Sequence, residues 1–273
     1  MTTKLIFDID GVLIDTRKSY IVAIQKTVEY FYKQNIDISL VEQLKRNEGF
    51  NNDWYASYVL TNCLLLKIEL DHYQRITNEN EIYSYEVVKN VFQSIYLGPE
   101  RYPVTIEDLK ETEGLWKKEA LIFTKKELMS LADKYGKLSI ITGRTKDEAE
   151  YALNYFNIFD LFSDVISVED IHDGYFSAFP QYKEYGVDKS NPVLLFQIPD
   201  IKTYPKLVYI GDNVSDMILV YNSRDTLPVK GINFLYDNTE EEIQKMKSKT
   251  VKYMPDFLAV SKQDVFDILT VSV

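Results

Sequence analysis

Three short apolar runs in this chain each end in polar residues, and this pattern constrains the fold more than any other feature. The runs are Lys4–Asp10 (KLIFDID), Leu138–Ile141 (LSII, followed by Thr142) and Leu207–Ile210 (LVYI, followed by GDNVSD). The first run is apolar on both faces, which is typical of a central strand in a parallel sheet. Because helix-like segments separate the runs, the sequence predicts an α/β fold with a doubly wound parallel sheet.

Further elements follow from the same patterns. Two more strands are expected, at Val165–Val168 and Val229–Phe234, and two helices are expected to finish the chain. Thr145 with Glu148 three residues later indicates a capping box at the start of a helix. The segment Ile171–Asp188 is aromatic and long for a connection in an α/β fold, and its role stays open.

The segment after the first run has a different pattern. Within Tyr20–Phe31, apolar side chains recur at spacings of four, four and three residues, as on one face of a helix, and another helix is expected over Asn52–Leu70. We therefore expect a core domain made of residues 1–15 and 124–273, into which residues 16–123 are inserted as a helical domain.

Composition narrows the classes of function. The chain has 273 residues, enough for a sizeable core, and a formal net charge of -11. An acidic chain repels phosphate backbones, so we expect no nucleic-acid partner. No apolar stretch is long enough to span a membrane, and the single cysteine, Cys63, is compatible with a reducing cytosol. We expect a cytoplasmic protein without a membrane partner, and the oligomeric state stays open.

The polar residues that follow the runs suggest a metal site. Ligands of parallel α/β sheets bind at the carboxyl ends of the strands, where Asp8, Asp10, Thr142, Asp212 and Asp216 are expected to meet. Four carboxylates in a partly desolvated site would repel one another. Mg²⁺ relieves such repulsion and prefers oxygen ligands. The sequence therefore predicts a Mg²⁺ site that involves the four aspartates.

The same residues suit phosphoryl transfer. One of Asp8 and Asp10 can attack phosphorus, while the other protonates the leaving oxygen and later activates water. Thr142 offers a hydroxyl and, with Gly143, backbone N–H groups at a turn before a helix, which favours an anion. Lys189 precedes another expected helix and can neutralise charge on phosphate oxygens.

Together these motifs resemble those of the haloacid dehalogenase-like hydrolase superfamily. Its first motif, DxDGxLxD, matches Asp8–Asp15, its second, a Thr or Ser after a hydrophobic strand, matches Thr142, and its fourth, GDxxxD, matches Gly211–Asp216. The resemblance implies a Rossmann-like core, with Asp8 as the nucleophile and Asp10 as the general acid and base.

The third motif of the family is a lysine, and its match is less direct. Lys189 in DKSNPVLL is similar to the family's KPxP-type segment, but Ser190 stands where proline is common and the preceding segment is longer than usual. Lys183 and Lys206 are therefore rivals for this position. The resemblance implies that Thr142 and the motif lysine bind phosphate.

The resemblance also specifies the metal ligands and the inserted domain. Mg²⁺ would be held by the Asp8 carboxylate, the Asp10 backbone carbonyl and Asp212, with Asp216 as a further ligand or behind the ligands. The helical domain, residues 16–123, looks like the mobile cap of the family.

The polar segment Gly49–Trp54 (GFNNDW) lies between two expected helices of the inserted domain. Asn51, Asn52 and Asp53 offer hydrogen bonds and one negative charge, and they are candidates for selecting a small polar or cationic organic phosphate. The alternative interpretation is that Asn52 or Asp53 caps a helix between two core aromatic residues.

These features favour a Mg²⁺-dependent phosphatase that hydrolyses a small organic phosphate monoester, so the expected partner is a small phosphorylated metabolite. Asp10 argues against a dehalogenase, an ATPase and a phosphonatase of the same family. A phosphomutase would share every core residue and stays an alternative. A receiver-like phospho-acceptor module also combines acids, a threonine and a lysine, but such modules are shorter and lack the insertion.

Overall fold

The structure is a computed structural model that describes residues 3–45, 50, 52–104, 106, 109, 113–171 and 178–271. The chain folds into two compact units, which we call the core unit (Met1–Asp15 with Leu121–Val273) and the helical unit (Thr16–Ala120). The helical unit ends before the expected boundary at Phe123, because Ile122 donates a backbone hydrogen bond to Leu13 and Phe123 is buried in the core unit.

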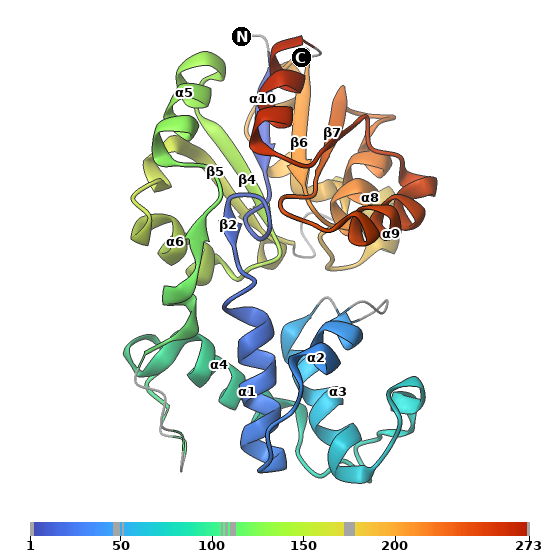
Figure 1. Ribbon diagram of the computed structural model, residues 1–273. Coiled ribbons are helices and arrows are strands. Elements are labelled where there is room, and N and C mark those ends of the chain that lie inside the picture. The colour runs from blue at the N-terminus through green and yellow to red at the C-terminus, as the bar shows by residue number, and fades with distance from the viewer. Residues whose placement is uncertain are drawn as a thin grey trace. The chain divides into compact units, whose positions relative to one another are not determined.

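The core unit contains a six-stranded sheet in the order β5-β4-β1-β6-β7-β8, and its neighbouring strands run parallel (Figure 1). This confirms the predicted α/β class. The last strand, β8, was not predicted, because three residues are too few to show a pattern. The strands are β1 (Lys4–Phe7), β4 (Leu138–Thr142), β5 (Phe162–Ser167), β6 (Leu207–Gly211), β7 (Val229–Phe234) and β8 (Phe257–Ala259).

Helices cover both faces of this sheet. Along β1, Leu5 and Phe7 pack in one cluster with residues of α5, α6 and α10, whereas Ile6 packs in the other with residues of α8 and η6. This alternation follows from the two-residue period of a strand, and it explains why the run is apolar on both faces. The helices are α5 (Lys125–Tyr135), α6 (Lys146–Tyr155), α8 (Val214–Ser223), α9 (Glu240–Thr250) and α10 (Lys262–Val271).

Side-chain caps define where these helices begin. The Thr145 hydroxyl accepts a hydrogen bond from the Glu148 backbone N–H at 3.3 Å, so Thr145 is the N-cap of α6, where the sequence placed a cap. At α5, Thr124 and Glu127 form a reciprocal capping box. Such caps satisfy backbone donors that otherwise have no partner within the helix.

The strand order of the sheet changes direction at β1. β1 lies between β4 and β6, and the strands that follow each of them extend outward on the two sides. This is the switch point at which open α/β sheets bind ligands, outside the carboxyl ends of the strands. Residues 8–11, directly after β1, therefore occupy the position where a site is expected.

Short 3₁₀ helices make up many of the connections in the core unit. The segment Ile171–Asp188 contains one of them, η5, in which Tyr182 is buried. The described 3₁₀ helices are η3 (Phe159–Leu161), η4 (Val168–Asp170), η5 (Pro180–Tyr185), η6 (Pro192–Gln197), η7 (Ile201–Thr203) and η8 (Val251–Tyr253). Two short strands, β2 (Ile14–Asp15) and β3 (Ala120–Leu121), form a separate two-stranded sheet.

The helical unit is built around three helices that pack on one another, α1, α3 and α4. The Tyr20 ring stacks on the Tyr96 ring, with centroids 4.5 Å apart. The sequence extended α3 too far, to Leu70; it ends at Leu66 because Lys67 adopts a left-handed conformation (φ 57°), a role more often taken by glycine. The elements are α1 (Tyr20–Tyr32), α2 (Ile38–Lys45), α3 (Asp53–Leu66), η1 (Leu70–Arg75), α4 (Tyr85–Arg101) and η2 (Leu115–Lys118).

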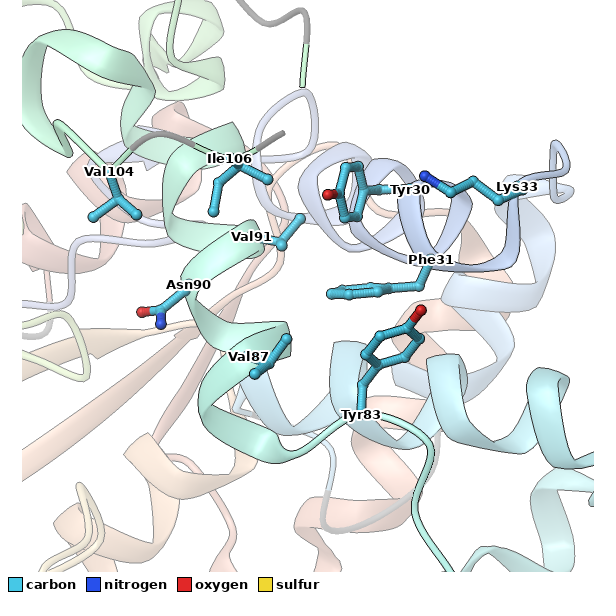
Figure 2. Close-up of a pocket in the computed structure, with 9 residues that line it drawn as sticks. All are labelled: Tyr30, Phe31, Lys33, Tyr83, Val87, Asn90, Val91, Val104 and Ile106. Atoms are coloured by element: carbon cyan, nitrogen blue, oxygen red, sulfur yellow. The ribbon is translucent and has the colours of Figure 1, made fainter. Parts of the chain in front are cut away.

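An aromatic cavity of about 400 Å³ lies within the helical unit. Figure 2 shows Phe31 beside Tyr83, with ring centroids 4.4 Å apart. Its lining is Tyr30, Phe31, Lys33, Tyr83, Val87, Asn90, Val91, Val104 and Ile106. These residues differ from the predicted substrate-selecting ones. Among the described residues, no helix is both long enough and apolar enough to cross a membrane.

Candidate active site

Asp8 lies directly after β1 and is 3% exposed. Its backbone N–H continues the strand ladder to the Ile210 carbonyl, so its side chain shares a sheet face with Ile6, the face that α8 covers. One carboxylate oxygen, Oδ1, accepts a hydrogen bond from the Ile9 N–H at 2.7 Å. The other, Oδ2, lies 2.5 Å from the ammonium group of Lys189.

Lys189 bridges two of the predicted site residues. Its Nζ lies 2.6 Å from Asp216 Oδ1 as well as close to Asp8, and its side chain is 12% exposed. The rival lysines lie elsewhere. Lys206 is at the opposite end of β6, where its carbonyl accepts the backbone N–H of Lys4, and Lys183 is exposed on η5. Of the three lysines, the structure brings Lys189 to Asp8.

Asp216 is held in place from three sides. It is fully buried in the first turn of α8, where its Oδ2 accepts the backbone N–H of Asn213 at 2.9 Å in a capping box. Its Oδ1 accepts the Tyr209 hydroxyl at 2.8 Å and faces Lys189. Sequence reasoning missed Tyr209, since a tyrosine inside the run LVYI has the pattern of an ordinary strand residue.

Two glycines allow the aspartates to approach the strand ends. Gly11 turns the chain after β1 with φ 71°, and a Cβ atom there would overlap the carboxylate of Asp212. A Cβ atom at Gly211 would overlap the side chain of Asp216. A side chain at either position would therefore displace an acid of the site, and at Gly11 it would also strain the backbone.

The donor set suits a hard divalent cation. Asp8, Asp212 and Asp216 each offer a carboxylate oxygen within 4.8 Å of the others. Burial raises the pKa of Asp8 to about 7; the charge of Lys189 opposes this rise, and those of Asp216 and Asp10 add to it. Burial, and then the charges of Asp8 and Asp216, raise the pKa of Asp212 well above its ordinary range. A cation such as Mg²⁺ would stabilise these carboxylates in their charged forms.

Asp10 is paired with an arginine that sequence reasoning did not single out. The Nε and Nη2 atoms of Arg144 donate to Asp10 Oδ1 at 2.9 and 2.7 Å. The Arg144 side chain is 1% exposed, whereas that of Asp10 is 34% exposed. The only sequence signal for Arg144 was its place in the motif ITGR, which indicated a turn.

Thr142 ends β4 and is fully buried. Its hydroxyl oxygen accepts the backbone N–H of Arg144 at 3.1 Å, so its O–H is available to donate to a ligand. Gly143 is exposed in the turn that follows. Because α6 begins only at Lys146, the N–H of Gly143 belongs to this turn rather than to the helix terminus.

The predicted substrate-selecting residues belong to the helical unit. Asn51 lies outside the described residues. Asn52 is the N-cap of α3, where its side chain accepts the Tyr55 N–H at 2.9 Å. Asp53 forms an ion pair of 2.7 Å with Lys45. Asn52 therefore caps a helix, as the alternative interpretation expected. A role of these residues in substrate selection stays a prediction.

Comparisons with known proteins agree with this geometry. A protein-family model described as haloacid dehalogenase-like hydrolase matches residues 5–219. A phosphatase from Thermococcus thioreducens is 27% identical, with 83% of this chain and 90% of that chain covered and a TM-score of 0.63. No curated protein matches the sequence.

Two further solved structures share the fold at lower identity. A predicted phosphoglycolate phosphatase from Haemophilus somnus is 14% identical, with 98% of each chain covered and a TM-score of 0.57. A candidate β-phosphoglucomutase from Thermotoga maritima is 15% identical, with 99% of this chain and 100% of that chain covered and a TM-score of 0.59. Because the family model spans more than half of the sequence and includes the strand-end residues described above, this chain belongs to the haloacid dehalogenase-like hydrolases.

Proposed function

We propose that this protein is a Mg²⁺-dependent phosphatase that hydrolyses a small organic phosphate monoester through an aspartyl phosphate on Asp8. The observation that carries this proposal is the buried Asp8 carboxylate beside the central strand, 2.5 Å from Lys189. A carboxylate paired with a cation at a ligand-binding sheet edge suits attack on an anionic phosphoryl group. The similarity to the Thermococcus phosphatase supports the same class of reaction.

In the first half of the reaction, a carboxylate oxygen of Asp8 attacks phosphorus. The bond between phosphorus and the ester oxygen breaks, and its electron pair stays on that oxygen. Protonated Asp10 donates its proton to the leaving oxygen, so the alcohol departs neutral. The products of this half are the free alcohol, a phosphorylated Asp8 and an ionised Asp10.

In the second half, water attacks the phosphorus atom of the aspartyl phosphate. Asp10, now a carboxylate, takes a proton from the attacking water. The bond between phosphorus and the Asp8 oxygen breaks, which releases inorganic phosphate and restores both aspartates. Lys189 and the Thr142 hydroxyl stabilise the negative charge on the phosphoryl oxygens throughout.

The metal would be held by the carboxylates of Asp8 and Asp212 and by the backbone carbonyl of Asp10. When bound, Mg²⁺ supplies positive charge that stabilises the phosphoryl oxygens and the ionised acids. Asp216 was predicted as a ligand or as a residue behind the ligands, and its oxygens already accept from Tyr209 and Asn213 and face Lys189. We propose that Asp216 mainly positions Lys189.

We assign the helical unit the role of a cap that selects the substrate, a small phosphorylated metabolite. The segment 49–54 remains the candidate for this selection, in spite of the Lys45–Asp53 ion pair. A cap of this kind excludes water and contacts the leaving group.

A panel of phosphorylated metabolites tests the proposal, with inorganic phosphate as the readout in the presence of Mg²⁺ and after chelation. We expect phosphate release from at least one monoester and loss of turnover without metal. Phosphate release that persists after rigorous chelation would contradict the metal requirement. Conversion of a phosphate ester to its isomer without phosphate release would instead identify a phosphomutase.

A further inference from the structure

Arg144 and Asp10 are joined by an unusual fork, in which both donors reach the same oxygen. Nε and Nη2 of Arg144 lie 2.9 and 2.7 Å from Asp10 Oδ1. Arginine more often spreads its two donors over both oxygens of a carboxylate. With both hydrogen bonds on Oδ1, the other oxygen of Asp10, Oδ2, is left for a different partner.

Arg144 is itself fixed by the ends of two strands. Its backbone N–H donates to the hydroxyl of Thr142, which ends β4, and its carbonyl accepts the hydroxyl of Ser167, which ends β5, at 2.7 Å. Ser167 and Thr142 are both fully buried. The backbone of Arg144 is therefore anchored to the ends of two strands, whereas the Asp10 side chain is more exposed.

We propose that Arg144 is a positioning residue that sets the rotamer of Asp10 and thereby leaves Oδ2 to face the leaving oxygen. An arginine side chain is a donor only, so both of its hydrogen bonds hold Oδ1 as an acceptor and fix the orientation of the carboxyl group. This inference rests on the proposed function, in which Asp10 is the general acid.

The inference predicts a particular kinetic signature. A misplaced acid slows departure of alcohols that need protonation more than that of p-nitrophenolate, which needs little. Arg144→Met should therefore lower kcat about tenfold or more for an alkyl phosphate substrate and clearly less for p-nitrophenyl phosphate, with KM within about twofold of wild type. A loss confined to KM would assign Arg144 to phosphate binding and overturn the inference.

A double-mutant cycle with Asp10→Asn separates this inference from the proposed function. If Arg144 acts through Asp10, Arg144→Met should change kcat by less than about twofold once Asp10 is already Asn. Losses that multiply in the double variant would overturn the positioning role. A wild-type rate in Asp10→Asn alone would instead contradict the proposed function.

Two further variants separate positioning from folding. Ser167→Ala removes the hydroxyl that donates to the Arg144 carbonyl but keeps the guanidinium group. It should therefore lower kcat with the same dependence on the leaving group as Arg144→Met, but by a smaller factor. Arg224→Met breaks another Arg–Asp ion pair of 2.7 Å, with Asp256, and should leave kcat unchanged for both esters. The Asp10 rotamer in a crystal structure of Arg144→Met gives a test that needs no activity: a second or altered rotamer is expected, and an unchanged one would overturn the inference.

Discussion

The hydroxyl of Tyr209, in β6, donates to Asp216 Oδ1 at 2.8 Å, and both residues are fully buried. Burial, and then the charges of Asp216 and Asp8, raise the pKa of Tyr209 well above its ordinary range. The phenol therefore remains a neutral donor at any pH where the enzyme would work. It helps to determine where Asp216 holds Lys189.

Replacing Tyr209 with Phe removes this donor at nearly constant shape. We expect kcat to fall several-fold and the free energy of unfolding to fall by about 1–3 kcal/mol, because Asp216 loses a buried hydrogen bond. Steady-state kinetics and chemical denaturation measure the two effects. Tyr182→Phe is the matched control, since it removes another hydroxyl contact, with Thr226 at 3.1 Å, and should leave kcat unchanged.

The three candidate lysines can be separated by substitution. Lys189→Met removes the cation beside Asp8 and Asp216, and we expect kcat/KM to fall about a hundredfold or more. Lys183→Met and Lys206→Met should keep near-normal kinetics, since neither lysine lies beside Asp8. A Lys189 variant with normal turnover, or a severe loss in either of the other two, would refute this assignment.

Stability should depend on pH in the metal-free protein. The pKa of Asp8 is raised to about 7 in the folded protein, above its ordinary value of 3.8. The folded state therefore binds a proton more tightly than the unfolded state between these two values, and stability falls as pH rises through this window. We expect a lower melting temperature at pH 8 than at pH 5.

Mg²⁺ should offset this loss because it stabilises the ionised carboxylates. The increase in melting temperature on adding Mg²⁺ should thus be larger at pH 8 than at pH 5. Asp8→Asn should show a weaker pH dependence across the same window. Identical pH dependence in wild type and Asp8→Asn would show that another group causes the effect.

The helical unit offers a test of capping against substrate selection. Asn52→Ala removes the side-chain acceptor of the Tyr55 N–H and should cost about 1 kcal/mol of unfolding free energy. Asp53→Asn should weaken kcat/KM for the best metabolite and leave that for p-nitrophenyl phosphate unchanged, if Asp53 contacts the leaving group. Lys45→Met is its control, because it removes the same ion pair and keeps the Asp53 carboxylate. If Asp53→Asn and Lys45→Met change kcat/KM equally for every substrate, the role of Asp53 is limited to its ion pair with Lys45.

Much of the fold could be predicted because each central strand is a continuous apolar run that ends in turn residues. Once parallel strands were expected, the carboxyl ends of β1 and β6 had to meet at one edge, which brings Asp8 near Asp212 and Asp216. The spacing of the motif lysine could not be resolved from the sequence. Its place depends on how the chain between Ile171 and η6 packs, and sequence patterns carry little information on such a segment.

Other features depend on tertiary contacts that leave no periodic signal. Tyr209 has the pattern of an apolar strand residue, and its hydroxyl meets Asp216 only when α8 packs on the sheet. Arg144 has the pattern of a turn residue, and its partner lies 134 positions away in sequence. β8 is too short to show alternation, and the end of α3 depends on a lysine in a left-handed conformation.

The nucleophile can be identified directly by trapping the covalent intermediate. An acid quench within the first turnover, followed by peptide mass spectrometry, should find phosphate on the peptide that contains Asp8. The adduct should be sensitive to hydroxylamine, as an acyl phosphate is, and it should be missing in Asp8→Asn. Phosphate attached to another residue, or full turnover by the purified Asp8→Asn enzyme, would contradict the account.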